Sequence, residues 1–455
     1  MIVGARSRPI LFIENREKTR FWAAVARVLM SRGIKVEWLV QNPMFVPRAA
    51  EQVHLVPFPD RQALAGGACP PPDLPALITD RGRQFFDAGD RHYPYYQKRI
   101  ADLIDDIRPG LIVGEATLLH ELLANQAAQQ RKIVFVQPVA GRYREDRFFL
   151  YLGETQIPFI GSDKPDDHAT RQALAASIAN GTSQPVYMVR PGRLIRALQK
   201  IKWAVTRARV WTGRWLGERY NTPSLRRKVA LAIRTRRNAR RWDRLAAMPA
   251  PGSRAILYPL QLQPESNIDV WGRPYSDQVA LIKALVAAAP SDVVIAVKSN
   301  PKLKYETSDG LLDLAGTSSR VMLLPRSLSM TEAHAVTLGA VTVCGTVGLE
   351  AIFGRGRCIS LRHPIIDEHF PDASAGSPQE AVHKLLESAS AGHGNVRDGE
   401  KLLMELERLS FPGLVSDPLT MPECLAPANV ELVADGIEAA WRCACDQSEH
   451  RRSVA

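Results

Sequence analysis

Short apolar blocks alternate with amphipathic blocks along the first 150 residues of the chain. An apolar run at Pro9–Ile13 precedes an amphipathic stretch at Lys18–Arg32, and a second run with strand-like alternation follows at Ile34–Val40. Apolar runs of this length predict buried strands, whereas apolar positions three and four residues apart predict a helix. The order strand, helix, strand predicts parallel strands joined by a right-handed crossover.

The alternation resumes after a Pro- and Gly-rich loop at Ala63–Pro75. It predicts two further helices and two further strands, with the helices at Tyr96–Ile107 and Leu118–Gln130 and the strands at Leu111–Val113 and Ile133–Val136. We therefore expect residues 1–150 to form a Rossmann-like domain around a parallel sheet.

The clearest alternation lies between Arg254 and His363. It predicts strands at Ala255–Leu260, Val293–Val297, Val321–Leu324, Val341–Cys344 and Cys358–Leu361, and helices at Asp277–Ala289, at Thr331–Thr337 and from Leu349 onward. Residues 251–400 are therefore expected to form a second Rossmann-like domain, and a cleft between two such domains is a frequent ligand site. We expect an insertion with basic helices at residues 151–250, and C-terminal helices at residues 401–455 that end in a disordered polar tail from Gln447.

The strand predicted at Val341–Cys344 runs directly into a glycine and then into a helix-forming sequence. Such a junction leaves backbone N–H groups and the positive end of a helix dipole at the end of the strand, where phosphates bind readily. Gly345 and Gly348 would let a ligand approach the backbone, and Glu350, expected in the first helical turn, would reach a sugar hydroxyl. The alternative is an ordinary strand-to-helix turn in which Glu350 only complements the helix dipole.

The net charge of +12 is concentrated in one segment. Between Arg190 and Arg244 the chain has 18 Lys and Arg residues against two acidic residues, with Trp203, Trp211 and Trp215 among them. A basic helix with interleaved tryptophans can lie on an anionic membrane surface. It can equally bind another polyanion, or pack one stripe on the protein and leave its charges in solvent, and the sequence leaves these alternatives open.

The remaining composition is typical of a reduced, cytoplasmic protein. The six cysteines have neither the spacing of a zinc site nor that of a disulfide framework, so no metal site is expected. Arg6 and Arg8 stand where a secretory signal would become apolar, and no apolar run approaches the roughly 18–20 residues that span a bilayer. Zinc-finger, helix-turn-helix and RNP patterns are missing, so nucleic acid is not the expected partner.

An arginine-rich stretch, Gly141–Arg147, follows the last strand predicted in the first domain. Loops beyond the carboxyl ends of parallel strands are where doubly wound sheets bind ligands. Arg142 and Arg144 are therefore candidates for binding an anionic acceptor. The alternative is a solvated loop.

Four short sequences occur in order in the second predicted domain: Tyr258–Ser266, Tyr275–Gln278, Val297–Pro301 and Gly345–Ala351. Together they resemble the bacterial capsule polysaccharide biosynthesis proteins, a family that includes the β-Kdo transferases acting on capsule lipid linkers. The resemblance covers about residues 254–363. That family is similar to the GT-B glycosyltransferases, which implies an α/β fold with two Rossmann-like domains facing a central cleft. It also implies an N-terminal acceptor domain, a C-terminal domain for the nucleotide-sugar donor, and no obligatory metal or cofactor.

The resemblance assigns roles to particular residues. The donor-binding residues that it implies are Gln263, Lys298, Asn300, Pro301, Gly345, Thr346, Val347, Gly348 and Glu350. Among these, Lys298 and the glycine turn would lie near the donor phosphate, and a lysine with a helix N-terminus can stabilise a leaving phosphate without a divalent ion. Glu265 and Asp269 are the candidates for general base or nucleophile.

One position departs from the family pattern, because relatives commonly have a His-Pro pair where this chain has Asn300-Pro301. Asparagine cannot carry a proton or a positive charge at neutral pH. If that histidine stabilises the leaving phosphate, another group must replace it here, and His334, His363 and Arg362 are the candidates.

The leading hypothesis is a glycosyltransferase of capsule or surface polysaccharide biosynthesis, cytoplasmic and in peripheral contact with the inner membrane. It would transfer a sugar, with CMP-Kdo as the first candidate donor, to a saccharide or lipid-linked acceptor. Two enzymatic alternatives keep the fold: a sugar-nucleotide 2-epimerase and a polyol-phosphate transferase. A non-catalytic polyanion- or polysaccharide-binding protein is a further alternative, and Asn300 favours it.

Overall fold

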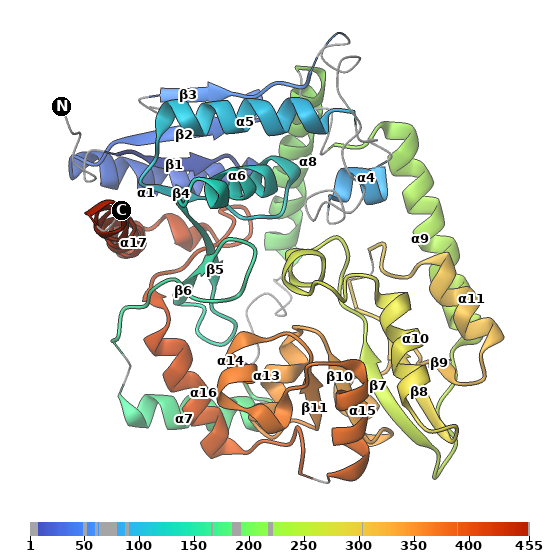
Figure 1. Ribbon diagram of the computed structural model, residues 1–455. Helices are drawn as coiled ribbons and strands as arrows, with labels where there is room; N and C mark the ends of the chain where they lie inside the picture. The colour runs from blue at the N-terminus through green and yellow to red at the C-terminus, as the bar shows by residue number, and fades with distance from the viewer. Residues whose placement is uncertain are drawn as a thin grey trace. The chain divides into compact units, whose positions relative to one another are not determined.

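The structure is a computed structural model that describes residues 8–48, 52–59, 62, 80–86, 91–164, 167–183, 193–216, 222–302, 304–388 and 390–453. The loop expected at Ala63–Pro75 lies outside these residues. The chain divides into two compact units (Figure 1). Unit 1 comprises Met1–Lys164, Pro185–Ser224 and Leu406–Ala455, and unit 2 comprises Pro165–Gln184 and Leu225–Glu405.

Unit 1 is built on a seven-stranded sheet with the order β12-β6-β5-β4-β1-β2-β3. The strands are β1 (Ile10–Ile13), β2 (Val36–Val40), β3 (Gln52–Leu55), β4 (Leu111–Val113), β5 (Val134–Ala140), β6 (Arg147–Leu152) and β12 (Phe411–Pro412). β1, β2, β3, β4 and β5 are parallel to one another. β6 is antiparallel to both of its neighbours, β5 and β12. Apart from the edge strand β12, this is the strand order of a doubly wound Rossmann sheet, so the fold predicted for the first domain is confirmed.

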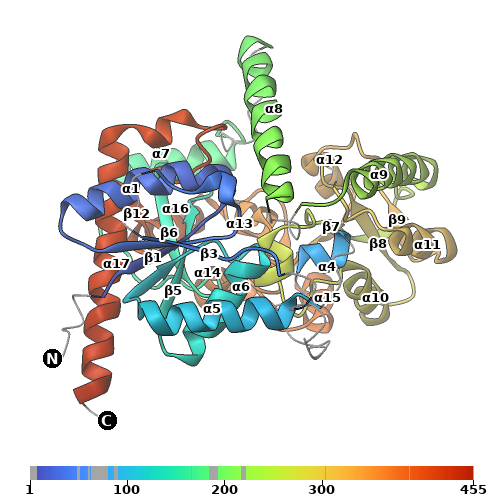
Figure 2. The ribbon, with the colours of Figure 1, turned by 90° about the horizontal axis from the view of Figure 1, so that it is seen from above.

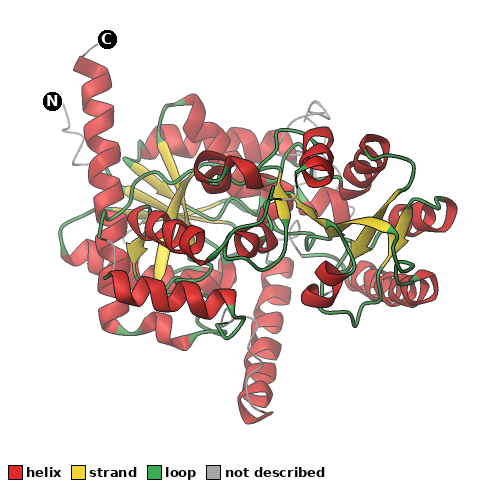
Figure 3. Cartoon of the chain, turned by 90° about the horizontal axis from the view of Figure 1, so that it is seen from below, coloured by secondary structure: helices red, strands yellow, loops and turns green. Residues whose placement is uncertain are grey.

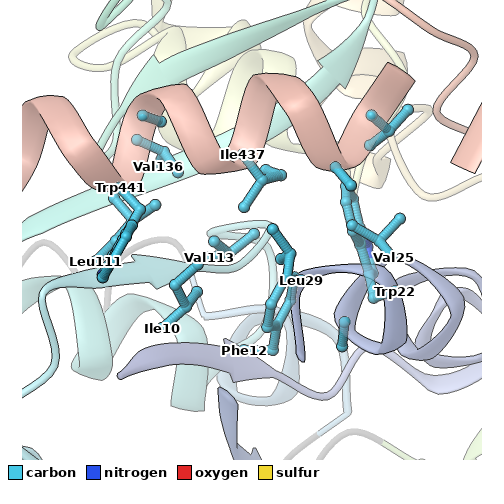
Figure 4. Close-up of a cluster of buried hydrophobic side chains, with 14 of the residues drawn as sticks. Ile10, Phe12, Trp22, Val25, Leu29, Leu111, Val113, Val136, Ile437 and Trp441 are labelled. Atoms are coloured by element: carbon cyan, nitrogen blue, oxygen red, sulfur yellow. The ribbon is translucent and has the colours of Figure 1, made fainter. Parts of the chain in front are cut away.

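Helices cover both faces of this sheet (Figure 3). The helices of unit 1 are α1 (Thr19–Ser31), α4 (Arg81–Phe86), α5 (Tyr93–Ile107), α6 (Leu119–Gln130), α8 (Arg193–Trp215) and α17 (Pro427–Ser453). α17 brings the C-terminus back to the first strands of the chain, where Ile437 and Trp441 pack with Phe12 and Leu29 (Figure 4). The indole Nε1 of Trp441 also donates a hydrogen bond to the Arg8 carbonyl at 3.1 Å.

The polar tail expected from Gln447 is instead helical as far as Ser453, so the expectation of disorder there is wrong. Ile437, Ala440, Trp441 and Ala444 form a buried stripe at helical spacing. Packing of this stripe nucleates the helix, and each further polar residue then adds a backbone hydrogen bond at little cost.

Unit 2 contains a five-stranded, fully parallel sheet with the order β11-β10-β7-β8-β9. The strands are β7 (Arg254–Pro259), β8 (Val293–Lys298), β9 (Val321–Leu323), β10 (Gly339–Thr342) and β11 (Cys358–Ser360). Each lies within two residues of its predicted range. The strands again have the Rossmann order. The order in which successive strands are added to the sheet reverses between β7 and β10.

The helices of unit 2 are α7 (His168–Ala179), α9 (Leu225–Leu245), α10 (Gln278–Ala288), α11 (Asp309–Thr317), α12 (Met330–Ala335), α13 (Thr346–Ile352), α14 (Pro364–His369), α15 (Pro378–Glu387) and most of α16 (Val396–Arg408). α10, α11 and α15 pack on one face of the sheet against large side chains such as Ile295 and Val341. α12 and α13 pack on the other face, where the sheet presents small residues such as Ala296 and Ala340. This alternation of faces continues to the carboxyl ends of the strands and positions the site described next.

Candidate functional site

The candidate site lies at the carboxyl ends of the strands of unit 2. Leu257 of β7 pairs with Ala296 of β8 and with Ala340 of β10. Two residues further along each strand, Lys298 and Thr342 therefore point to the same face, the face that α13 covers. They lie on strands that flank β7, about 10 Å apart. Doubly wound sheets bind ligands at this point, where the strand order reverses.

A glutamine network joins the loop after β7 to the start of α10. The Gln278 side chain is buried; its Oε1 accepts from the Gln261 N–H at 2.8 Å and from the Tyr258 hydroxyl at 3.1 Å. Its Nε2 donates to the Gln261 carbonyl and to Gln263 Oε1, both at 2.9 Å. Gln263 Nε2 in turn donates to Asp269 Oδ1 at 2.6 Å. The predicted donor-binding Gln263 is therefore engaged in holding its own loop.

Gln261 extends this network across the reversal of strand order. With its amide oxygen facing the main chain, it accepts from the N–H groups of Val343 and Cys344 at 3.1 and 3.3 Å. The loop after β7 is thereby fixed to the end of β10, although the two segments are more than 80 residues apart in the chain. Gln261 and Gln278 were not among the predicted site residues, although both lie in the short sequences Tyr258–Ser266 and Tyr275–Gln278 that carry the resemblance.

The two candidate catalytic carboxylates have different environments. Asp269 is 3% exposed, and besides its bond from Gln263 it accepts from the Glu265 N–H at 2.9 Å. Glu265 is half-buried, and no described residue donates a hydrogen bond to its carboxylate. Asp269 therefore shapes the loop, and Glu265 is the carboxylate that remains available for chemistry.

Lys298, the last residue of β8, is buried, with 3% of the residue exposed. Its Nζ donates to the carbonyls of Ser299 and Arg326 at 3.4 and 3.3 Å, and the described residues offer it no carboxylate. Burial lowers the pKa of this lysine. A buried cation without a counter-ion is costly, and an anionic ligand would offset the cost.

Other predicted residues at this edge provide no second buried cation beside Lys298. Asn300 is half-buried, and its Oδ1 accepts from the Lys302 N–H at 3.0 Å, while Pro301 is exposed. His363 and Arg362 follow β11 at the same edge; the histidine is buried, and the arginine is exposed without a described acidic partner. His334 precedes β10, at the opposite edge of the sheet, and thus cannot substitute for the missing histidine.

The glycine turn after β10 is present, but its glycines have a packing role. A Cβ on Gly345 would lie 2.6 Å from Thr342 Oγ1, and one on Gly348 would lie 3.2 Å from Ile366 Cδ1. Gly345 caps α13 without a side-chain hydrogen bond, and Thr346 and Val347 form its half-buried first turn. The glycines therefore allow α13 to approach the sheet closely, as well as leaving its first turn uncapped.

Glu350 does not lie in the first turn of α13, so that expectation is wrong. The helix begins at Thr346, and Glu350 occupies its second turn, with its carboxylate 4.0 Å from Arg355 Nη1. Arg355 follows the helix, at the edge where the strands begin. Burial raises the pKa of Glu350.

The arginine-rich loop of unit 1 is the turn of the β5–β6 hairpin. Arg144 forms ion pairs with Asp146 and with the fully buried Glu407, each at 2.8 Å. Arg142 is half-buried. Arg144 therefore connects the hairpin to α16.

The reversal point of unit 1, between β1 and β4, also carries ionisable groups. The buried Glu14 accepts from the Arg16 N–H at 2.5 Å and from the Asn42 N–H at 3.0 Å, and burial raises its pKa. His120, 1% exposed, has its Nε2 3.2 Å from the Glu14 carbonyl, and its Nδ1 has no described partner. The Nε2–H tautomer follows from this contact, which leaves Nδ1 as a proton acceptor.

The start of α6 in unit 1 is occupied by the protein's own carboxylate. The buried Glu121 accepts from the N–H groups of Glu115, Thr117 and Leu118, at 3.0, 3.0 and 2.9 Å. The Glu121 carboxylate thus occupies the N–H groups at the start of α6, which in other Rossmann sheets could bind a phosphate. The comparable position in unit 2 has no such carboxylate in its first turn.

The chain is thus an α/β protein with two Rossmann-like units. No family model and no curated protein matches it. Solved structures that are similar to it include the UDP-GlcNAc 2-epimerase of Methanocaldococcus jannaschii, with 11% identity over 88% of this chain and 98% of that chain and a TM-score of 0.25. The glycotransferase of kitacinnamycin has 13% identity over 95% and 99% of the two chains, with a TM-score of 0.25. KpsC of Thermosulfurimonas dismutans, a beta Kdo 2,7 transferase, has 10% identity over 88% and 100%, with a TM-score of 0.31.

Proposed function

We propose that unit 2 binds the phosphate of a nucleotide sugar at the carboxyl ends of β7, β8 and β10. The observation that carries this proposal is the buried ammonium of Lys298, which has main-chain carbonyls as partners and no described carboxylate. Burying a cation in this way is unfavourable for the free protein, so the lysine is most easily explained by an anion that binds to it. The uncapped first turn of α13, on the same face of the sheet, offers further N–H donors.

The reaction that these groups support best is glycosyl transfer. Lys298 and the exposed Arg362 would stabilise the charge that develops on the leaving phosphate. These two cations would thereby take the role of the histidine that is missing at Asn300. Glu265 would serve as general base or nucleophile, and Asp269 and Gln263 would position its loop. CMP-Kdo remains the first donor to test. The acceptor would be a saccharide or lipid-linked saccharide, with Arg142 as a contact for its anionic groups.

A panel of CMP-, UDP-, GDP- and CDP-linked ligands in a thermal-shift assay tests the binding site. One nucleotide class should raise the melting temperature of the wild type, and Lys298→Met should abolish that rise. Lys302→Met is the matched control, because it removes an exposed lysine four residues away and should leave the rise unchanged. Equal stabilisation of Lys298→Met and the wild type would refute the proposed phosphate site.

A sugar-nucleotide 2-epimerase is the second candidate, and the buried His120 of unit 1 favours it. An epimerase needs a base that removes a proton from carbon, and the partner-free Nδ1 of His120 is such a group. Product analysis separates the two functions. In the absence of any acceptor, an epimerase converts the nucleotide sugar that it binds into its 2-epimer. A transferase releases free nucleotide only when an acceptor is present or, slowly, by transfer to water.

A further inference from the structure

Helix α8 of unit 1 is strongly basic along its whole length. Its 23 residues, Arg193–Trp215, include seven Lys and Arg residues and no Asp or Glu. Figure 2 shows this helix (green) extending away from the sheet of unit 1.

Among the described side chains of α8, residues 201–215, the buried positions lie on one face. Thr206 and Gly213, seven residues apart, are its inward positions, and a Cβ on Gly213 would collide with the Asn42 side chain. Arg209 donates to the Met44 carbonyl at 2.5 Å, and its guanidinium lies 4.7 Å from the centre of the Phe45 ring. These contacts orient the helix about its axis.

The opposite face carries large apolar side chains in contact with solvent. Ile201, Val205 and Trp215 are 63%, 58% and 80% exposed. They belong to positions spaced alternately four and three residues apart, so they form one stripe along the helix. Lys202 and Arg207 are exposed beside this stripe.

We infer that the outer face of α8 docks on the surface of an anionic lipid bilayer. Apolar side chains flanked by cations are what a helix lying in the membrane interface requires. A polyanion in solution would bind mainly the cations, and it would gain little from the exposed aliphatic side chains of Ile201 and Val205. Within the described residues, no helix combines the length and the apolarity needed to cross a bilayer, so the contact is with the surface.

Helix α9, which carries the rest of the basic segment, is a different case. Its Arg234 and Arg237 pair with Asp309 of α11, at 3.2 and 2.8 Å, and its Trp242 is fully buried in unit 2. Part of its charge is therefore already neutralised inside the protein. α9 also exposes apolar side chains, but part of its charge is neutralised, whereas the exposed Lys202 and Arg207 of α8 have no described acidic partner.

Co-sedimentation of the full chain with vesicles tests this inference. The wild type should bind vesicles of phosphatidylcholine with 30% phosphatidylglycerol, a composition of about one anionic lipid in three, and should not bind pure phosphatidylcholine. Ile201→Ser/Val205→Ser/Trp215→Ser should weaken the binding at least tenfold. Lys202→Glu/Arg207→Glu should also weaken it more than tenfold, since each cation near such a surface is worth about a factor of five.

The control is Leu225→Ser/Val229→Ser/Ile233→Ser on α9, which removes side chains of similar exposure, 64%, 50% and 61%. Its vesicle binding should stay within twofold of the wild type. Equal binding of the α8 serine variant and the wild type would overturn the inference, as would equal binding of the wild type to neutral vesicles. If heparin displaces the wild type and the serine variant binds vesicles normally, α8 is a polyanion site instead. Failure here leaves the nucleotide thermal shift unaffected, so the two proposals fail separately.

Discussion

At the scale of single residues, Lys298 is expected to favour nucleotide binding and to destabilise the ligand-free protein. Because the ammonium is buried without a carboxylate, Lys298→Met should raise the melting temperature of the ligand-free protein by roughly 2–4 °C, the shift that about 1 kcal/mol produces in a domain of this size. The same variant should lose stabilisation by nucleotide. Thermal melts with and without ligand measure both effects, and a lower melting temperature for the ligand-free variant would show that the lysine is structural.

The pKa of Lys298 gives this effect a pH dependence. Burial lowers its pKa in the folded state, so the unfolded chain binds the proton more tightly. Stability contributed by this site therefore rises as pH increases through the lowered folded pKa towards the unfolded value of 10.5. The stability advantage of Lys298→Met should shrink over that alkaline range. Denaturant unfolding measured between pH 7 and pH 10, at pH values about one unit apart, would reveal this change. A constant advantage would contradict this account.

His120 is the residue of unit 1 with the clearest chemical capacity. His120→Gln retains a donor towards the Glu14 carbonyl but lacks a proton acceptor, so folding should persist while turnover falls about 10²–10⁴-fold. His54→Gln, at a histidine of the same unit that pairs with Glu37, is the control for turnover. A fall in turnover in His120→Gln alone, with nucleotide binding retained, would identify the base, and unchanged turnover would restrict His120 to packing.

Residue roles were the least predictable part of the site. The resemblance singled out Lys298, Gln263 and Glu265, and the apolar patterning predicted the strands that precede them. It could not show that Asp269 is buried by the loop that it holds, nor that Gln278 closes the network. It also misplaced Glu350, since a one-turn difference in where α13 begins moves a side chain to the other end of the helix.

At the scale of elements, the start of α13 depends on a close approach to the sheet. A Cβ on Gly345 would meet the Thr342 hydroxyl at 2.6 Å, so Gly345→Ala should cost about 1–3 kcal/mol of stability and weaken nucleotide binding. Gly316→Ala in α11 is the matched control: a Cβ there meets nothing within 4 Å, and the better helix propensity of alanine should leave stability equal or higher by up to about 1 kcal/mol. Urea unfolding compares the two, and equal effects would argue against the packing constraint.

Elements with a clear apolar pattern were predictable, and elements without one were not. α5, α6 and the five strands of unit 2 were placed within a few residues, because their apolar positions carry the periodicity of buried structure. β3, with exposed or half-buried side chains throughout, and the two-residue β12 carry no such pattern. β12 exists because Phe411 pairs with Phe148 of β6, a contact 263 positions apart in the chain that no local pattern reports.

At the scale of the whole molecule, unit 1 is completed by the C-terminal segment. Residues from Leu406 onward supply β12 and α17, and Trp441 of α17 packs with the first strands of the chain. Trp441→Ala should therefore destabilise unit 1 by about 3–5 kcal/mol, since it removes a large buried side chain and its bond to the Arg8 carbonyl. The proposed nucleotide site lies in unit 2, and none of the residues proposed for it belongs to α17. The dissociation constant for nucleotide, measured by calorimetry at a temperature where the variant is folded, should stay within twofold of the wild type. If Trp441→Ala lost nucleotide binding under those conditions, the assignment of the phosphate site to unit 2 alone would be wrong.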